Sequence, residues 1–437
     1  MTSFRSKMIV VAGVLLMPVV FFAPVSAARI DTPVGNYPYS LSAADFDGDG
    51  DIDLVAANYK SGDVSVLKND GQGSFEPAVN FQAGLYPRTV AAGDFDGDGD
   101  WDLAVTIDST QLVAVLFNNG AGVFAEPINY TVGLNPSSVC VGEFNGDGNV
   151  DLAVSNFSSS NISVLMNDGG GVFASAVNYE TGYGPNGITA ADFDGDNDID
   201  LAVVNSSSDN MSVLLNAGDG AFGPAVNYGL RDFPVSVIAA DLDHDGDNDL
   251  AAVDYFSSQV SVLINDGDGT FNPAVNHGTG LQPISIFAGD LDLDGDDDLA
   301  IVNCWDHNIS VMENVGGETY GTAVSYRSGR YPHTLCAADL DLDGDLDLAV
   351  PNAGSNTVST FANHGDGTFY SCGDANGDAM PDVGDIVYLI NYSFKGGPPP
   401  ALFLESGDAN CDGDSNVGDA VYLVNYVFKG GAEPCAG

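Results

Sequence analysis

The chain has 437 residues, and its 62 acidic and 11 basic side chains give a formal net charge of −51 at pH 7. This surplus of carboxylates argues against nucleic acid and anionic membrane surfaces as partners. Hydrophobic residues make up 44% of the chain, which is enough for a real core and argues against a disordered acidic tail.

The N-terminal segment has the pattern of a secretory signal peptide. Arg5 and Lys7 precede an apolar run over residues 8–22, and Val25-Ser26-Ala27 resembles a small-residue cleavage site. A membrane anchor is the alternative, but the run is shorter than the roughly 20 apolar residues that a spanning helix needs. We therefore expect residues 1–27 to be a signal peptide, and the mature protein to be secreted or at the cell surface, without membrane insertion and as a monomer.

A 49-residue repeat organises the next part of the chain. The acidic stretch at residues 45–54, DFDGDGDIDL, returns six more times without an insertion. In the fifth unit, apolar runs separated by turn residues predict strands at 235–240, 250–253, 260–264 and 271–276. Four strands every 40 to 50 residues are typical of a β-propeller. The sequence therefore predicts a mainly β fold with seven blades over residues 28–370.

The ends of the repeat region predict how the ring closes. The last unit has no outer strand of its own, whereas residues 29–36 supply an unpaired equivalent before the first unit. We expect this N-terminal segment to complete the seventh blade, which would remove an open sheet edge.

Each acidic stretch has the spacing of an oxygen cage for a cation. Carboxylates or amides stand at positions 1, 3 and 5, position 6 tolerates positive φ, position 7 supplies a carbonyl, and position 9 is again acidic. Plain polar hairpin turns are the alternative, but they do not explain four carboxylates that repel one another by roughly 3 kcal/mol per pair. Calcium, with six to eight oxygen ligands, is the cofactor predicted for about seven propeller sites.

The predicted ligands form five sets. Position 1 holds Asp45, Asp94, Glu143, Asp192, Asp241, Asp290 and Asp339; position 3 holds Asp47, Asp96, Asn145, Asp194, Asp243, Asp292 and Asp341; position 5 holds Asp49, Asp98, Asp147, Asp196, Asp245, Asp294 and Asp343. Position 7 holds Asp51, Asp100, Asn149, Asp198, Asp247, Asp296 and Asp345; position 9 holds Asp53, Asp102, Asp151, Asp200, Asp249, Asp298 and Asp347.

The repeats resemble the FG-GAP or VCBS-type repeat of propellers like those of integrin α-subunits. The resemblance is carried by the acidic stretch together with GSFEPA at 73–78 and GAFGPA at 220–225. It implies that each acidic loop joins the first two strands of a blade and binds calcium on one rim. It does not imply integrin-like adhesion, because a fold alone does not give a partner.

A different doublet follows at residues 371–437. Each copy has a twelve-position loop and then a predicted helix, at 386–394 and 420–428. The candidate ligands are Asp374, Asn376, Asp378, Met380 (through its carbonyl), Asp382 and Asp385 in the first loop, and Asp408, Asn410, Asp412, Asp414, Asn416 and Asp419 in the second. The doublet resembles a type I dockerin, which implies up to two more calcium ions and a cohesin-type scaffold as partner. Because Ala379 replaces the loop glycine, a plain structural EF-hand pair stays open.

The rim opposite the acidic loops collects irregular aromatic residues. Aromatic rings on loops of a rigid scaffold often bind sugars or proteins, but they can also simply cover the seams between blades. The candidate ligand residues on this rim are Tyr37, Tyr86, Arg88, Trp305, His307, Tyr331 and His333.

No catalytic motif appears in the sequence, so no catalytic residues are predicted. We expect a calcium-binding, non-catalytic binding or adhesion protein that recognises a carbohydrate or an extracellular protein and is attached by its C-terminal module. Two alternatives stay open: an enzyme or accessory subunit of polysaccharide breakdown, and a purely structural surface protein.

Overall fold

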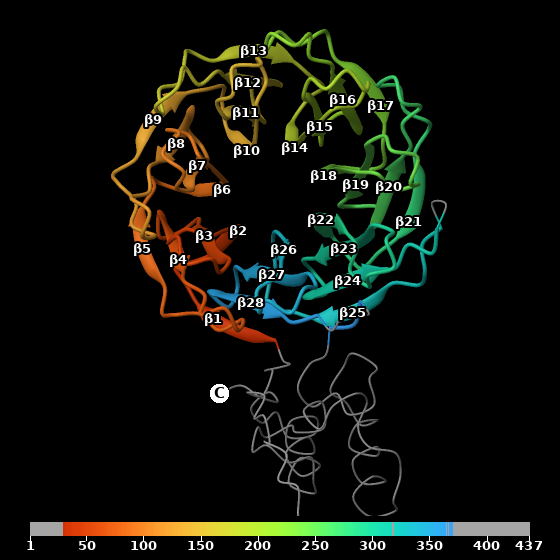
Figure 1. The fold of residues 1–437 in the computed structure, drawn as a ribbon. Coiled ribbons are helices and arrows are strands. Elements are labelled where there is room, and N and C mark those ends of the chain that lie inside the picture. The colour runs from red at the N-terminus through yellow and green to blue at the C-terminus, as the bar shows by residue number, and fades with distance from the viewer. Residues whose placement is uncertain (1–28, 317–318, 364, 366, 370–437) are drawn as a thin grey trace, which may run out of the picture.

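The computed structural model describes residues 29–369 except 317–318, 364 and 366. Its strands form seven four-stranded antiparallel sheets arranged as blades around one axis (Figure 1). The seven-bladed propeller predicted from the 49-residue repeat is therefore confirmed. The predicted signal peptide (1–27) and dockerin-like module (371–437) lie outside the described residues.

Each blade runs from an inner strand at the axis to an outer strand at the perimeter. The inner strands are β2 (Pro38–Ala44), β6 (Pro87–Gly93), β10 (Pro136–Gly142), β14 (Pro185–Ala191), β18 (Pro234–Ala240), β22 (Pro283–Gly289) and β26 (Cys336–Ala338). The second strands are β3 (Asp53–Asn58), β7 (Asp102–Ile107), β11 (Asp151–Asn156), β15 (Asp200–Asn205), β19 (Asp249–Asp254), β23 (Asp298–Asn303) and β27 (Asp347–Asn352).

The outer half of each blade has two shorter strands. The third strands are β4 (Asp63–Leu67), β8 (Leu112–Leu116), β12 (Asn161–Leu165), β16 (Asn210–Leu214), β20 (Gln259–Leu263), β24 (Asn308–Met312) and β28 (Thr357–Phe361). The outer strands are β5 (Val79–Gln82), β9 (Ile128–Thr131), β13 (Val177–Glu180), β17 (Val226–Gly229), β21 (Val275–Gly278), β25 (Val324–Arg327) and β1 (Ile30–Pro33).

The N-terminal strand closes the ring, as predicted. Strand β1 pairs antiparallel with β28 and becomes the outer strand of the seventh blade, with Ile30 opposite Thr360 and Pro33 opposite Thr357. Residues at the two ends of the repeat region thus share one sheet. The first and last blades are held together by backbone hydrogen bonds as well as by packing.

The core lies between the blades. All six residues of β3 are buried, because its sheet is covered by a neighbouring blade on each face, whereas the outer strand β5 is largely exposed. Phe46, the second residue of the first acidic loop, packs edge-on against Phe124 of the next blade with ring centroids 5.8 Å apart. Successive blades therefore interlock through the residue that the repeat places inside each acidic loop.

The predicted outer strand was wrong in its bounds. In the fifth blade it was expected at 271–276, but β21 covers Val275–Gly278, and Phe271 makes only an isolated bridge to Asn265. The same start recurs in a blade without proline at this position, at Val177 after Ser175, so it is a property of the repeat and not of Pro273.

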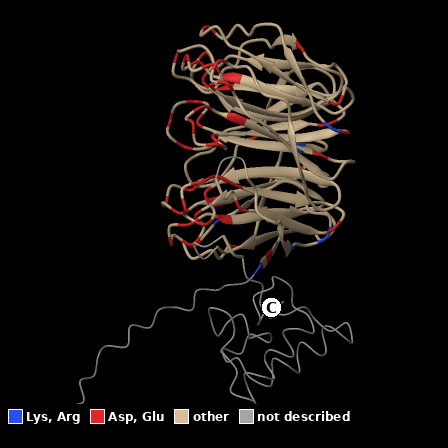
Figure 2. Ribbon diagram, turned by 90° about the vertical axis from the view of Figure 1, so that its right-hand side faces the viewer, with Lys and Arg blue, Asp and Glu red and all other residues tan. Residues whose placement is uncertain are grey.

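The two rims of the ring differ in charge. The loops between the first and second strands of each blade carry most of the Asp and Glu residues (Figure 2). We call their side of the ring, which also holds the turns between third and outer strands, the acidic rim. We call the loops on the other side the opposite rim. They join second to third strands, and outer strands to the next blade. Among the described residues, no helix has the length and apolar character that a membrane crossing requires.

Candidate functional site

Each acidic loop is folded around its first carboxylate. In the first blade, Asp45 Oδ1 accepts a hydrogen bond from the Gly48 N–H at 2.7 Å, and Oδ2 accepts one from the Gly50 N–H at 3.0 Å. Gly50 has φ of 99°, and Asn197 at the equivalent position of the fourth blade has φ of 70°. The left-handed sixth position predicted from the sequence is therefore present, including at its one asparagine.

The folded loops bring several carboxylates together. Within each of the following sets, one oxygen per residue lies within 4.8 Å of the others: Asp45, Asp47 and Asp53; Asp94, Asp96 and Asp102; Asp192, Asp194 and Asp200; Asp241, Asp243 and Asp249; Asp290, Asp292 and Asp294. Sequence positions 1, 3 and 9, or 1, 3 and 5, thus converge as the cage spacing predicted.

Some of these oxygens have no protein partner. Oδ1 of Asp47, Asp194, Asp341 and Asp345 is buried and accepts no hydrogen bond. A buried carboxylate oxygen without a donor is costly. A hard cation that prefers oxygen ligands, such as calcium, would satisfy it. The residues of these loops therefore fit the cofactor that their spacing predicts.

The ninth position has a second role that the sequence did not reveal. Asp53 is fully buried, and its two oxygens accept hydrogen bonds from the Phe46 N–H at 3.1 Å and the Asn69 N–H at 2.7 Å. It thereby ties the acidic loop to the turn after β4. Burial raises the pKa of Asp53 to about 6, although the two N–H donors partly oppose the shift.

The same shift recurs around the ring. Burial is the largest cause in every blade, and it raises the pKa of Asp151, Asp200, Asp249 and Asp298 to about 6 and that of Asp102 and Asp347 to about 7. Neighbouring carboxylates of the same loops add to the shift. A nearby cation would favour the charged forms and oppose it.

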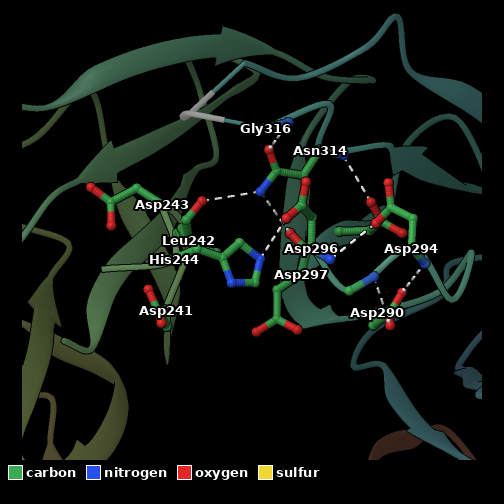
Figure 3. A network of polar contacts seen from close by, with 12 residues as sticks. Asp241, Leu242, Asp243, His244, Asp290, Asp294, Asp296, Asp297, Asn314 and Gly316 are labelled. Carbon is green, nitrogen blue, oxygen red and sulfur yellow. Dashed lines mark hydrogen bonds and ion pairs between the residues drawn. The ribbon is translucent and has the colours of Figure 1, made fainter. Parts of the chain in front are cut away.

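An asparagine recurs every 49 residues in the turn after each third strand, and its side chain connects the blades. In the sixth blade, Asn314 Nδ2 donates to the Leu242 carbonyl of the fifth blade at 3.0 Å, and to the Asp297 carbonyl of its own blade at 3.3 Å (Figure 3). The contact recurs at the closure, where Asn69 Nδ2 donates to the Leu340 carbonyl at 2.7 Å. Periodicity could not show this role, because the partner carbonyl belongs to another repeat.

One histidine links two acidic loops. His244 stands where the first four loops have glycine, keeps the same left-handed backbone (φ 64°), and places Nε2 2.6 Å from Asp296 Oδ1 of the next loop (Figure 3). Asp296 was predicted to contribute its carbonyl at position 7. Its side chain has a further role, because it bridges two blades.

The opposite rim gathers a continuous cluster of rings near the axis. Tyr39 stacks on His333 with centroids 4.1 Å apart, and Tyr59 lies 5.9 Å from Tyr39 and 5.2 Å from Tyr86. Tyr37 contacts both Tyr59 and His333. The predicted residues Tyr37, Tyr86 and His333 are thus brought together, and Tyr39 and Tyr59 join them.

The other predicted rim residues are arranged differently. His307 and Tyr331 form a separate edge-on pair, and the His307 Nδ1 accepts a hydrogen bond from the Tyr331 N–H. Trp305 is 58% exposed. His333, expected to be a ligand-facing residue, is only 7% exposed. Its ring is stacked on Tyr39 within the cluster and does not face solvent.

Aromatic residues on this rim occupy backbone that does not suit them. The residue before the inner-strand proline has positive φ in all seven blades: Tyr37, Tyr86, Asn135, Gly184, Phe233, Gln282 and Tyr331. Glycine and asparagine adopt this region readily, whereas other residues do so at a cost of roughly 1 kcal/mol. Four aromatic side chains thus stand where the fold would prefer a small one. Strain of this kind concentrates at functional sites.

Comparisons with known proteins agree with this architecture. The chain matches the FG-GAP-like repeat family over residues 45–105, 94–154, 143–203, 192–252, 243–301 and 290–350. No curated protein matches the chain.

Solved structures with similar folds have unrelated activities. Virginiamycin B lyase from Staphylococcus aureus is 14% identical, with a TM-score of 0.54 over 76% of this chain and 98% of that chain. A putative 6-phosphogluconolactonase from Bacteroides uniformis is 16% identical, with a TM-score of 0.53 over 78% and 94%. BBS1N, solved in complex with ARL6DN, is 13% identical, with a TM-score of 0.55 over 76% and 96%. At such identities the likeness shows the propeller fold alone.

The family matches overlap from one blade to the next and together span residues 45–350, which is more than half of the chain. Five of the six matches contain two successive acidic loops, and the match at 243–301 begins at the third position of its first loop. The chain therefore belongs to the FG-GAP-like repeat family.

Proposed function

We propose that this chain is an exported, calcium-stabilised, non-catalytic binding protein whose ligand face is the rim opposite the acidic loops. One observation carries the proposal. Tyr37, Tyr86, Phe233 and Tyr331 repeat one left-handed backbone position with bulky rings, where Asn135 and Gly184 would be relaxed. Rings kept at a cost in strain on exposed loops suit the recognition of a sugar or a protein surface.

Calcium is proposed as the structural cofactor of the acidic rim. The support is the convergence of carboxylate oxygens within 4.8 Å and the buried, unpartnered oxygens of residues such as Asp47 and Asp194. Millimolar calcium outside cells would suit sites of the weak extracellular class, with Kd of roughly 10⁻⁴–10⁻³ M.

Attachment through the C-terminal module is proposed from sequence alone. Its duplicated twelve-position loops at 374–385 and 408–419 suggest calcium-dependent binding to a cohesin-type scaffold. A cohesin panel probed with the full chain tests this, with Asp374→Ala and Asp408→Ala each expected to weaken capture. Binding that needs no calcium, or no capture by any cohesin, would leave a structural EF-hand pair as the better account.

The ligand face is tested by arrays of glycans and extracellular matrix proteins. Trp305→Ala and Tyr331→Ala should abolish or strongly weaken whatever binding the full chain shows, because these side chains are 58% and 38% exposed on this rim. Val172→Ala is the matched control, since Val172 is 58% exposed on the acidic rim. Equal loss from both kinds of change, or no binding on either array, would contradict the proposal.

A further inference from the structure

The inner strands contain one irregular position near the opposite rim. In each of the first six blades the pairing register shifts just after the inner-strand proline, as at Pro38/Ser40 and Pro87/Val90. The residues that follow the proline are Tyr39, Arg88, Ser137, Asn186, Val235 and Ile284, and His333 takes the same place in the seventh blade. Bulges of this kind re-aim side chains and are frequent beside binding sites.

Arg88 is the one basic residue at this position. Its Nη2 donates to Asn186 Oδ1 at 3.0 Å, reaching from the second blade to the fourth past the third. Its guanidinium carbon lies 5.6 Å from the centre of the Tyr39 ring. Among the described residues, no carboxylate lies within ion-pair distance of Arg88, although the chain has an excess of 51 negative charges.

A half-buried guanidinium with one hydrogen bond leaves most of its five donors unused. Arginine is well suited to a carboxylate, because its fork can donate two parallel hydrogen bonds. In a protein this acidic, an arginine kept away from carboxylates near the axis is a candidate anion receptor.

A second group in the cluster also lacks a partner. His333 is 7% exposed, and its Nδ1 is buried with no hydrogen bond. Burial and the nearby Arg88 lower the pKa of His333 to about 4, so the ring is neutral at pH 7. The neutral ring adds no charge beside Arg88, and its buried Nδ1 does not reach a ligand.

Aromatic rings surround these two groups. Tyr37, Tyr59 and Tyr86 form a connected set beside Tyr39, and the hydroxyl of Tyr59 is held by a hydrogen bond to Asp108 Oδ2 at 2.7 Å. Tyr86 is 45% exposed, so this set reaches the surface of the rim. Such rings bind the apolar face of a pyranose.

We infer that the cluster of Arg88, His333 and the four tyrosines at 37, 39, 59 and 86 binds an acidic sugar. Arg88 receives the carboxylate of a uronic acid residue, and the tyrosines pack on the sugar ring. This inference rests on the proposed function and names its ligand class. A neutral sugar would leave the guanidinium unpaired, and an acidic peptide would supply a carboxylate but no pyranose face for the tyrosines.

The test measures binding of galacturonic acid oligomers to the full chain by calorimetry, at roughly physiological ionic strength because exposed charges are then screened. The same oligomers as methyl esters, and an Asp-rich peptide of equal charge, serve as the comparison probes. We expect the acid oligomer to bind at least tenfold more tightly than the ester, as charge-assisted hydrogen bonds to a half-buried arginine require.

Variants locate the binding, since calcium on the acidic rim also attracts uronates. Arg88→Gln should weaken binding of the acid oligomer at least tenfold, and Arg88→Lys should weaken it less. Arg330→Gln, which removes an exposed charge on the same rim, should change it less than about twofold. Melting curves check that each variant is folded. If Arg88→Gln does not fold, the comparison of acid and ester on the unmodified chain still tests the inference.

The inference is overturned if acid and ester bind alike, if the peptide binds and the oligomer does not, or if Arg88→Gln binds as the unmodified chain does. Neutral glycans or proteins that bind with dependence on Trp305 would then leave the proposed function intact. Absence of all binding to the opposite rim would overturn both.

Discussion

The two rims of the ring are built by the same repeat, but they treat its seven copies differently. On the acidic rim, the backbone and the side chains recur together, so that Asp53 and its six equivalents are all buried and all have a raised pKa. On the opposite rim the backbone recurs and the side chains do not, as Tyr37 and Gly184 at one left-handed position show. Side chains that recur in every blade suit a role that each blade needs, such as its own stabilisation. Side chains that differ between blades on the same backbone suit a single binding site.

The largest expected effect on stability comes from removing calcium. At ten times Kd each bound ion would add about 1.4 kcal/mol to the free energy of unfolding, so seven loops could add on the order of 10 kcal/mol, comparable to the whole stability of a domain. We expect the melting temperature to fall by about 10–20 °C between roughly 2 mM calcium and excess chelator. A shift of only a degree or two would mean that the loops are ordinary polar turns.

A second prediction concerns the contacts between blades. Asn265 Nδ2 donates to the Phe193 carbonyl at 2.8 Å and to the Asn248 carbonyl at 3.0 Å. Asn265→Ala leaves both buried carbonyls without this donor and should cost about 3 kcal/mol in urea unfolding. Asn272→Ala, in the exposed part of the same turn, should cost less than about 0.5 kcal/mol. Similar losses from both would show that the asparagine contact does not hold blades together.

A third prediction uses a residue that departs from its repeat. Second strands end in a buried asparagine in five blades, but β19 ends in Asp254, whose pKa is raised by burial to about 6. A carboxyl with a raised folded-state pKa stabilises the fold when protonated, and this contribution is lost as pH rises from about 4 through about 6. Asp254→Asn should therefore add about 2 kcal/mol at pH 7.5 and little below pH 4.

The control for this change is Asp232→Asn, because Asp232 is exposed on the same rim. Its effect on urea unfolding should be within about 0.5 kcal/mol at either pH. A benefit of Asp254→Asn that is equal at pH 4 and pH 7.5 would show that the carboxyl does not titrate in the folded ring.

The smallest expected effect on stability comes from an exposed side chain of the opposite rim. Trp305→Ala should change the free energy of unfolding by less than about 0.5 kcal/mol, because Trp305 is largely exposed. His333→Ala should cost about 2 kcal/mol or more, because its ring is buried and stacked on Tyr39. Calorimetric melting in calcium measures both. A costly Trp305→Ala would mean that this rim also serves stability.

The sequence predicted what one repeat unit encodes. Turn residues and apolar runs gave the blade count, and the unpaired segment at 29–36 gave the ring closure that β1 makes. Acid spacing gave the loop in which Asp45 and Asp47 converge. The sequence did not predict the contacts between units. Asn265 bonds to a carbonyl 72 positions away, and Arg88 meets Asn186 98 positions away.

Other errors concern the surroundings of single side chains, which the pattern of one unit does not show. His333, which was predicted to face a ligand, is buried with its ring stacked on Tyr39 of another blade. Asp53 was predicted only as a ligand, because the two N–H groups that it accepts come from the loop and from a turn 16 positions later.

The most direct test of the division between the rims is the number of calcium ions bound per chain, measured by equilibrium dialysis at roughly 2 mM free calcium. We predict about seven ions from the seven acidic loops, with up to about two more from the C-terminal loops. A chain with Asp374→Ala and Asp408→Ala should lose only the extra ions. A total of two or fewer, lost with those two changes, would contradict the account.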